Sequence, residues 1–162
     1  MKRLAVAFTG PSNSGKTTII EKIAKILIEQ NFKVVIIKND PKDKAKFDIE
    51  GKDSYKFFQT GADVIITSPT RTTLFRQSES DLDELIKLAD DFDYLIIEGL
   101  KTFPLPRIAV FRDRVDESYF DFIKAVAISD IDKNLIPNQI EVLELNNPLE
   151  ICDWINKNAK VV

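Results

Sequence analysis

The segment that most constrains the fold is the run GPSNSGKT at positions 10–17, which fits the pattern G-x-x-x-x-G-K-[ST] without a mismatch. A short apolar run, Leu4–Thr9, precedes it, and apolar residues at helical spacing follow it from position 19 to position 27. A glycine-rich turn that matched the pattern by chance would lack this context. The order of strand, glycine-rich loop and helix is typical of a loop that wraps around phosphate groups.

Each residue type in this loop has a physical role in binding a nucleoside triphosphate. Two glycines let the backbone approach phosphate oxygens, so that successive N–H groups point inward. Lys16 places an ammonium group against the β- and γ-phosphates, and the Thr17 hydroxyl is a ligand for Mg²⁺. The residues predicted to contact the nucleotide here are Gly10, Ser12, Asn13, Ser14, Gly15, Lys16, Thr17 and Thr18.

The rest of the chain alternates between apolar strand patterns and helical patterns. Further strands are expected at 33–38, 63–68, 72–76, 94–98, 107–112, 124–129 and 140–145, with helices at 54–60, around 82–89 and from Pro148 onward. This alternation predicts an α/β three-layer P-loop NTPase fold, with a mainly parallel sheet, helices on both faces and a small antiparallel hairpin over 63–76. We expect residues 1–162 to form a single nucleotide-binding domain.

Two acidic residues are predicted to stand beside the phosphate loop. Glu98 ends the apolar run DYLIIE, and Asp40 follows KVVIIKN. Because ligands of open α/β sheets bind at the carboxyl ends of the strands, we expect both acids to act with Lys16 in catalysis and with Thr17 around Mg²⁺. The alternatives are a solvated acid at the end of a strand for Glu98 and a turn-forming residue before Pro41 for Asp40.

The sequence constrains less strongly which nucleobase the site would bind. Asp130 follows the apolar run KAVAIS, and a carboxylate there could accept hydrogen bonds from guanine N1–H and N2–H₂. Asp130 could equally cap the next turn.

Composition excludes several classes of function. A net charge of −3 and a pI of about 5.1 provide no basic footprint for nucleic acid. The chain contains no histidine and one cysteine, so the ligands for a Zn²⁺, Ni²⁺ or Cu²⁺ site are missing, and a nickel-inserting GTPase chaperone is excluded. The lone cysteine fits a reducing cytoplasm, and no apolar stretch approaches the roughly 20 residues needed to span a membrane. We therefore expect a cytoplasmic protein.

Three segments outside the phosphate loop are more specific to one protein family than the loop itself. They are IIKNDP at 36–41, FDIEGKDSYKFFQTGADVIITSPTRTTLF at 47–75, and YLIIEGLKTFPLPRIAVFR at 94–112. Together they resemble the bacterial molybdopterin-guanine dinucleotide biosynthesis adaptor proteins, the MobB family. The resemblance runs from the N-terminus to about position 130. One departure concerns the second strand, which in the family usually ends in Lys-His and here ends in Lys38-Asn39.

The resemblance implies GTP binding at the loop with weak hydrolysis, a homodimer, and a role beside the guanylyltransferase that joins GMP to molybdopterin. It also implies molybdopterin as a possible bound ligand. It places the block 51–54 beside the nucleotide, where Lys52 could reach a phosphate and Asp53 could be a metal-side acid or a helix cap. Lys101, Arg107 and Arg112 could bind an anionic pterin phosphate, or they could be ordinary solvated cations.

The alternative from another class is a small-molecule kinase that uses the same loop. Such kinases usually add an arginine-bearing lid, and the segment RDRVDES at 112–118 is a short candidate for it.

Overall fold

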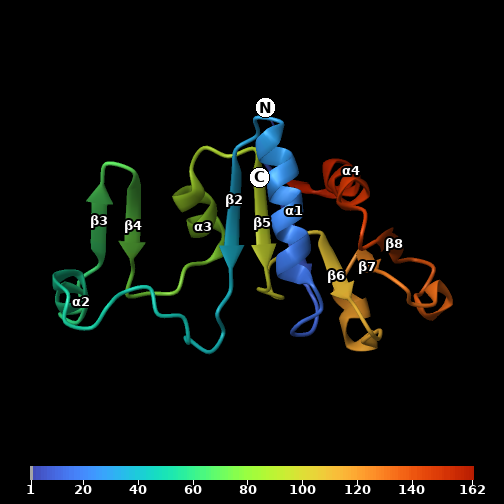
Figure 1. Ribbon diagram of the computed structural model, residues 1–162, viewed down its shortest axis with the longest axis horizontal. Coiled ribbons are helices and arrows are strands. Elements are labelled where there is room, and N and C mark those ends of the chain that lie inside the picture. Colours follow the sequence, from blue (N-terminus) through green and yellow to red (C-terminus); the bar gives the residue numbers. More distant parts are fainter. Residues whose placement is uncertain (1) are drawn as a thin grey trace. The chain divides into compact units, whose positions relative to one another are not determined.

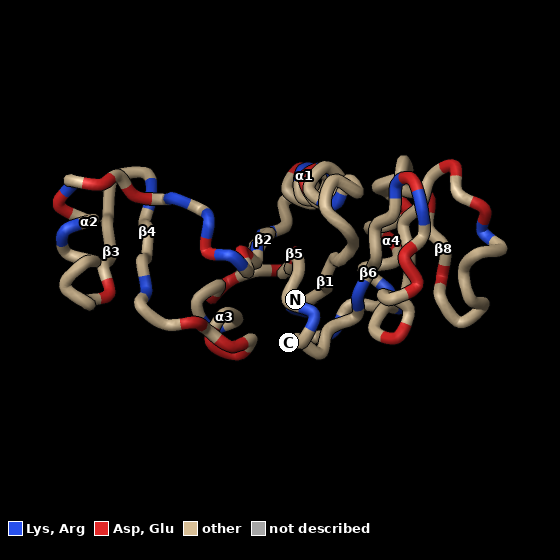
Figure 2. The backbone as a smooth tube through the Cα atoms, turned by 90° about the horizontal axis from the view of Figure 1, so that it is seen from below, with Lys and Arg blue, Asp and Glu red and all other residues tan. Residues whose placement is uncertain are grey.

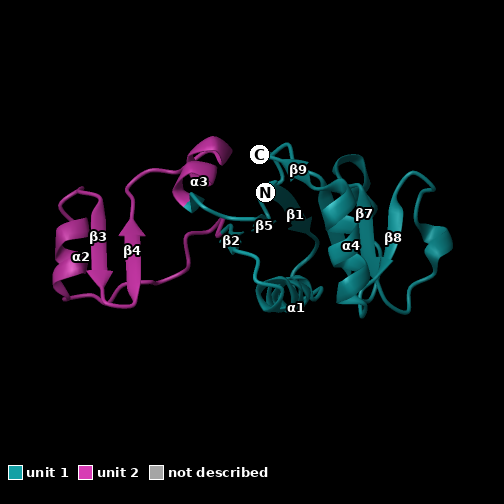
Figure 3. Ribbon diagram, turned by 90° about the horizontal axis from the view of Figure 1, so that it is seen from above, with its two compact units in different colours: residues 1–39, 89–162 teal, residues 40–88 magenta. Residues whose placement is uncertain are grey.

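The computed structural model describes residues 2–162, and these divide into two compact units. Unit 1 comprises the residues up to Asn39 together with Ala89–Val162, and unit 2 comprises Asp40–Leu88 (Figure 3). Charged residues of both signs are interspersed along each unit (Figure 2). Among the described residues, no helix is long and apolar enough to cross a membrane.

Unit 1 is built on a mostly parallel sheet with the strand order β2-β5-β1-β6-β7-β8. A seventh strand, β9, pairs antiparallel with β1. The strands are β1 (Leu4–Thr9), β2 (Val34–Lys38), β5 (Tyr94–Glu98), β6 (Arg107–Phe111), β7 (Ala125–Ile128), β8 (Glu141–Glu144) and β9 (Lys160–Val161). The six parallel strands end at one edge, so this edge collects the loops that follow them.

Helices α1 (Lys16–Glu29) and α4 (Pro148–Asn158) pack on one face of this sheet (Figure 1). Their apolar stripes meet Val6, Phe8 and Ile96 of the sheet, and all of these are at most 1% exposed. Asn147 caps α4, its side chain accepting a hydrogen bond from the Glu150 N–H at 3.3 Å.

The other face of the sheet is covered over β6 and β7 by short 3₁₀ helices, η1 (Glu117–Phe122) and η2 (Lys133–Leu135). The η1 residue Tyr119 is buried, and its ring meets Phe111 edge-on, with the ring centroids 5.8 Å apart. Val126 and Ile128 of β7 belong to the same apolar cluster. The mainly parallel sheet with helices, predicted from the sequence, is confirmed.

Unit 2 contains α2 (Asp53–Phe58), a two-stranded antiparallel hairpin of β3 (Val64–Ser68) and β4 (Arg71–Phe75), and most of α3 (Leu82–Ala89). The predicted hairpin is therefore confirmed. Phe58 of α2 packs on Phe75 of β4, with the ring centroids 6.0 Å apart. The Gln77 side-chain amide donates to the Phe58 carbonyl at 2.7 Å, which ties the end of the hairpin to α2.

Candidate functional site

The loop between β1 and α1 makes a close turn at its first glycine. Gly10 has φ +136°, and a Cβ there would lie 2.4 Å from the backbone oxygen of Val110 on β6. Real Cβ atoms do not come this close to a carbonyl oxygen, so a larger residue would push the loop away from the sheet. Gly15, at φ +98°, ends the loop where α1 begins. The glycine spacing therefore follows from the path of the backbone.

Lys16 folds back over the loop that carries it. Its ammonium group donates to the carbonyl oxygens of Gly10 at 2.9 Å and Pro11 at 2.6 Å. Burial lowers the pKa of Lys16, and the negative charge of Glu98 opposes this shift. A cation is thus held at the mouth of the loop by neutral carbonyl groups, where an anion can compete for it.

The donors in the loop fit a phosphate group and a hard cation. The Ser14 hydroxyl is buried, and its oxygen has no hydrogen-bond partner among the described residues. Thr17 lies exposed in the first turn of α1, next to Lys16. No group of three or more Asp, Glu or Cys side chains within residues 2–162 converges to hold a metal ion. The Thr17 hydroxyl is a hard oxygen donor of the kind that Mg²⁺ takes together with phosphate oxygens and water.

The phosphate hollow lies at this loop. Glu98 ends β5 and Lys38 ends β2, and the two are register partners whose side chains form an ion pair at 3.1 Å. The Glu98 side chain is only 14% exposed. The residues that line the phosphate hollow are Ser12, Asn13, Gly15, Lys16, Thr17, Thr18, Lys38, Glu98 and Arg112. Sequence reasoning missed Lys38, although it ends its strand level with Glu98.

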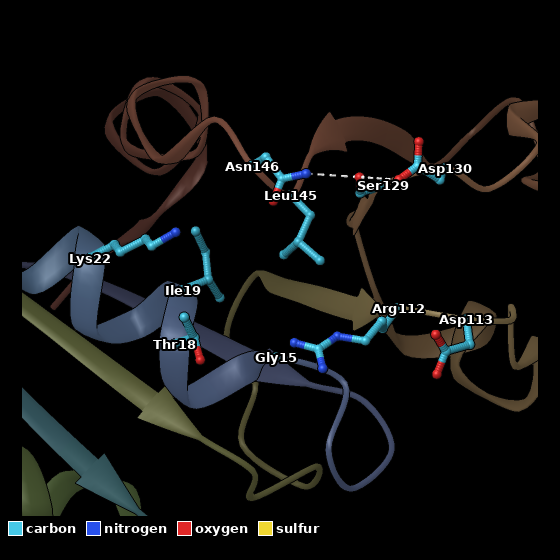
Figure 4. Close-up of a pocket in the computed structure, with 10 residues that line it drawn as sticks. All are labelled: Gly15, Thr18, Ile19, Lys22, Arg112, Asp113, Ser129, Asp130, Leu145 and Asn146. Carbon is cyan, nitrogen blue, oxygen red and sulfur yellow. Dashed lines mark hydrogen bonds between the residues drawn. The ribbon is translucent and has the colours of Figure 1, made fainter.

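The base hollow, of about 500 Å³, adjoins the loop on the side of β6, β7 and β8 (Figure 4). Asp130 lines it, so the fold brings this sequence-predicted residue beside the loop. Asn146 donates its amide N–H to the Ser129 oxygen at 2.8 Å, and the Ser129 hydroxyl donates to Asp130 at 3.2 Å. The residues that line the base hollow are Gly15, Thr18, Ile19, Lys22, Arg112, Asp113, Ser129, Asp130, Leu145 and Asn146.

The hydrogen-bond chain orients the acceptors of the base hollow. Asn146 uses one of its two amide N–H donors toward Ser129, and its amide oxygen and the Asp130 carboxylate are available to accept further hydrogen bonds. Asp130 has φ +57°, a left-handed conformation that Asp and Asn tolerate better than most residues. Sequence reasoning missed Asn146, because nothing in the linear sequence indicates that the side chain two positions after β8 reaches Ser129.

Three predicted residues, Asp40, Lys52 and Asp53, belong to unit 2. One carboxylate oxygen of Asp40 accepts the backbone N–H groups of Lys44 at 2.7 Å and Ala45 at 2.6 Å, as a turn-forming residue does. Lys52 occupies the N-cap position of α2 in extended conformation, without a side-chain cap bond. Asp53 is the first residue of α2 and pairs with Lys56 at 3.7 Å. The roles of Asp40 and Lys52 toward a nucleotide stay predictions.

The interpretation of Arg107 as a cation for a pterin phosphate is wrong. Arg107 is 1% exposed, and its guanidinium donates to the carbonyl oxygens of Gly99 at 2.7 Å, Leu100 at 2.8 Å and Phe103 at 3.2 Å. It fixes the loop that follows Glu98. Lys101, in the same loop, lies over the Tyr119 ring, with its ammonium 4.3 Å from the ring centroid.

Asn39, which replaces the usual family histidine, supports the ends of two strands. Its backbone N–H donates to the Glu98 carbonyl at 3.0 Å. A Cβ at Gly99, which has φ +91°, would lie 3.1 Å from the Asn39 Cβ. The residue after β2 is thus packed against the turn after β5.

Comparison with known proteins places this arrangement in a family. The model of molybdopterin guanine dinucleotide synthesis protein B (MobB) matches residues 5–130. A molybdopterin-guanine dinucleotide biosynthesis adapter protein of Haemophilus influenzae is 30% identical over 162 residues, covering 93% of this chain and 86% of the relative. A relative from Methanocaldococcus jannaschii is 29% identical over 136 residues, which make up 80% of this chain and 56% of that protein.

The fold agrees with a solved structure as well. The crystal structure of molybdopterin-guanine biosynthesis protein B (mobB) is 26% identical, has a TM-score of 0.73, and covers 95% of this chain and 99% of that one. The phosphate loop, the acid at the end of β5 and the loop held by Arg107 all lie within the residues that the family model matches. The chain therefore belongs to the MobB family of molybdopterin guanine dinucleotide synthesis proteins.

Proposed function

We propose that this protein is a GTP-binding adaptor with weak GTP hydrolysis, which assists the conversion of molybdopterin to molybdopterin guanine dinucleotide. The observation that carries the proposal is the position of Asp130 and Asn146 in a hollow that shares Gly15 and Thr18 with the phosphate loop. A nucleotide with its phosphates on the loop can place its base there. Membership of the MobB family supports the biological role.

The acceptors of the base hollow favour guanine. Guanine presents two adjacent donors, N1–H and N2–H₂, to a carboxylate, whereas the corresponding edge of adenine offers one amino donor beside an acceptor nitrogen. Asp130 can accept both guanine bonds. Leu145 and Ile19 supply apolar surface for the faces of the base. We therefore infer a preference for GTP over ATP.

Hydrolysis would depend on few groups. Mg²⁺, when bound, would supply positive charge that offsets the charge building up on the phosphates. Thr17 would hold the ion, and Lys16 would contact the phosphates. Glu98, close to its strand end and paired with Lys38, would orient water in the phosphate hollow. Asp40 is retained as a second acid of the site by the family resemblance alone. The chain contains no histidine, so a general base at this site would have to be a carboxylate such as Glu98.

We further propose a homodimer in the cytoplasm that binds molybdopterin and works beside the guanylyltransferase. Support for the dimer comes from unit 2, whose isolated two-stranded sheet exposes Ile65 at 65% and whose helix α2 exposes Phe57 at 59%. A two-stranded sheet is marginal by itself and gains from a covering partner. Ile65→Lys should convert the dimer to a monomer in analytical ultracentrifugation, and an unchanged dimer would rule out this surface.

The kinase alternative would need a mobile lid at 112–118. The segment leads into η1, whose Tyr119 is buried against Phe111. Asp116 caps η1 by accepting the Ser118 N–H at 3.1 Å. Anchoring of this kind weighs against a lid. Analysis of the reaction products distinguishes the two functions. Release of free phosphate from GTP without phosphorylation of a small metabolite would support the adaptor and contradict the kinase.

The deciding experiment compares thermal stabilisation by Mg·GTP and Mg·ATP. Ligand at about 100 times its Kd adds about 2.7 kcal/mol, or roughly 5–10 °C for a chain of this size. Lys16→Ala should abolish this shift, whereas Lys25→Ala, which removes an exposed pair with Glu21 on α1, should preserve it. Asp130→Asn, which suits the left-handed backbone, should weaken GTP about tenfold or more and leave ATP unchanged. Full stabilisation of Lys16→Ala by GTP would refute the site.

A further inference from the structure

We propose that Arg112 binds the phosphate groups of the bound nucleotide from the side of β6 and so acts as a second cation of the phosphate loop. This inference rests on the proposed nucleotide site and adds a residue to it. Arg112 directly follows β6, the strand that pairs with β1 on the side away from Glu98. The loop would therefore have a cation on each side, Lys38 at the end of β2 and Arg112 after β6.

The guanidinium reaches the loop itself. One of its nitrogens, Nη2, lies 3.7 Å from the position that a Cβ on Gly15 would occupy. In Figure 4 the Arg112 side chain points toward the start of α1, whereas the Asp113 carboxylate lies away from that helix. Arg112 lines the phosphate hollow as well as the base hollow. It thus lies at the junction of the two, where the phosphate tail of a nucleotide must run.

Arg112 is also available for a ligand. Asp113 and Asp130 line the base hollow with it, yet within residues 2–162 the Arg112 side chain forms no ion pair or hydrogen bond. An exposed guanidinium with its donors unused, fixed at the end of a buried strand, can offer a planar pair of N–H groups to a phosphate.

The neighbouring cations are placed differently. Arg107 is committed to three backbone carbonyls, and Lys101 lies over an aromatic ring. Arg114, two residues after Arg112, lines a neighbouring hollow with Glu117 and Leu135, which shares Asp113 and Asp130 with the base hollow and includes no residue of the phosphate loop. Of the basic residues around β6, Arg112 is the one whose surroundings match a phosphate ligand.

The test measures Kd for Mg·GTP, Mg·GDP and Mg·ATP with the full-length protein and three variants. Arg112→Ala should weaken all three nucleotides by about tenfold or more, because a charge-assisted contact to phosphate is lost regardless of base. Arg112→Lys should recover part of the affinity, since it restores the charge without the planar fork. Arg114→Ala is the matched control and should bind as the unmodified protein does.

Three results would overturn the inference. Unchanged GTP and GDP affinity in Arg112→Ala would remove Arg112 from the site. A loss confined to GTP, with ATP unaffected, would assign Arg112 to the base. An equal loss in Arg114→Ala would indicate only a general effect of surface charge. If the unmodified protein itself bound no nucleotide, the proposed function would fail, which separates that failure from one limited to Arg112.

Discussion

Replacing Arg107 by methionine tests how the loop after Glu98 is held. Methionine keeps much of the length and apolar volume of the side chain and removes the donors. Three backbone carbonyls, those of Gly99, Leu100 and Phe103, then lose their partner inside the protein. Because the guanidinium is buried, water cannot readily replace it.

The magnitude follows from the two short bonds, at 2.7 and 2.8 Å. Hydrogen bonds to charged groups contribute about 1.5–3 kcal/mol each. We use the lower value, because removing a buried cation also removes the free-energy cost of desolvating its charge. The same desolvation lowers the pKa of Arg107. The third bond, at 3.2 Å, is weaker and is left out. The free energy of unfolding should therefore fall by about 3 kcal/mol.

Urea unfolding followed by tryptophan fluorescence measures this loss. Trp154 is the only tryptophan, is buried in α4, and belongs to the same unit as Arg107. The midpoint should fall while the slope stays the same. Arg107→Lys should regain only part of the stability, since one ammonium cannot reach all three carbonyls equally. Arg112→Met, an exposed arginine five positions on, is the control and should change stability by less than about 0.5 kcal/mol.

A loss below about 1 kcal/mol in Arg107→Met, or a loss equal to that of the control, would refute the reasoning. Either result would mean that the carbonyls find other donors and that the loop after Glu98 does not depend on the buried cation.

Two further predictions concern unit 1. Gly10→Ala should lower the free energy of unfolding by about 3 kcal/mol, because its Cβ would lie 2.4 Å from the Val110 oxygen. Gly15→Ala should lower it by only about 1 kcal/mol, because its Cβ meets only the Arg112 guanidinium at 3.7 Å and the cost comes from the positive φ. Equal losses of the two variants in urea unfolding would contradict the close approach at Gly10. Burial raises the pKa of Cys152 to about 11 from an ordinary 9.0, so the thiol loses its proton at lower pH in the unfolded chain than in the folded one. The free energy of unfolding should therefore decline as pH rises from about 9 to about 11. A Cys152→Ala variant should lack that part of the decline, and a pH profile identical to that of the unmodified protein would contradict the prediction.

Much of the scaffold could be predicted from the chain. The GPSNSGKT segment, the apolar run before it and the helical stripe after it fixed the order of strand, loop and helix, since buried strands and amphipathic helices have distinct periods. The Asn147-Pro148 start of α4 was also readable, because the cap bond forms between residues three apart. Local geometry of this kind depends only on neighbours in the sequence.

Predicting the site residues required knowing which segments distant in the sequence meet in the fold. Glu98 and Asp130 could be predicted because each follows an apolar run, and parallel strands end at a common edge. Lys38 and Arg112 also stand at the ends of apolar runs, but this position alone does not distinguish a phosphate contact from a solvated cation, and Asn146 has no comparable signal. Which loops meet depends on the strand order β2-β5-β1-β6-β7-β8, and the sequence pattern does not specify that order.

Arg107 and Arg112 show most clearly what cannot be predicted from the sequence alone. Both flank the same apolar strand, RIAVFR, and in sequence either could be a surface cation. The sequence by itself determined that the chain has a P-loop and that these arginines lie at the two ends of one strand. Only the tertiary structure decided that one end is covered by the loop 99–103, which supplies three carbonyls to Arg107, while the other end opens beside Gly15. The physical reason is that burial and hydrogen-bond partners depend on which distant segments pack against each strand end.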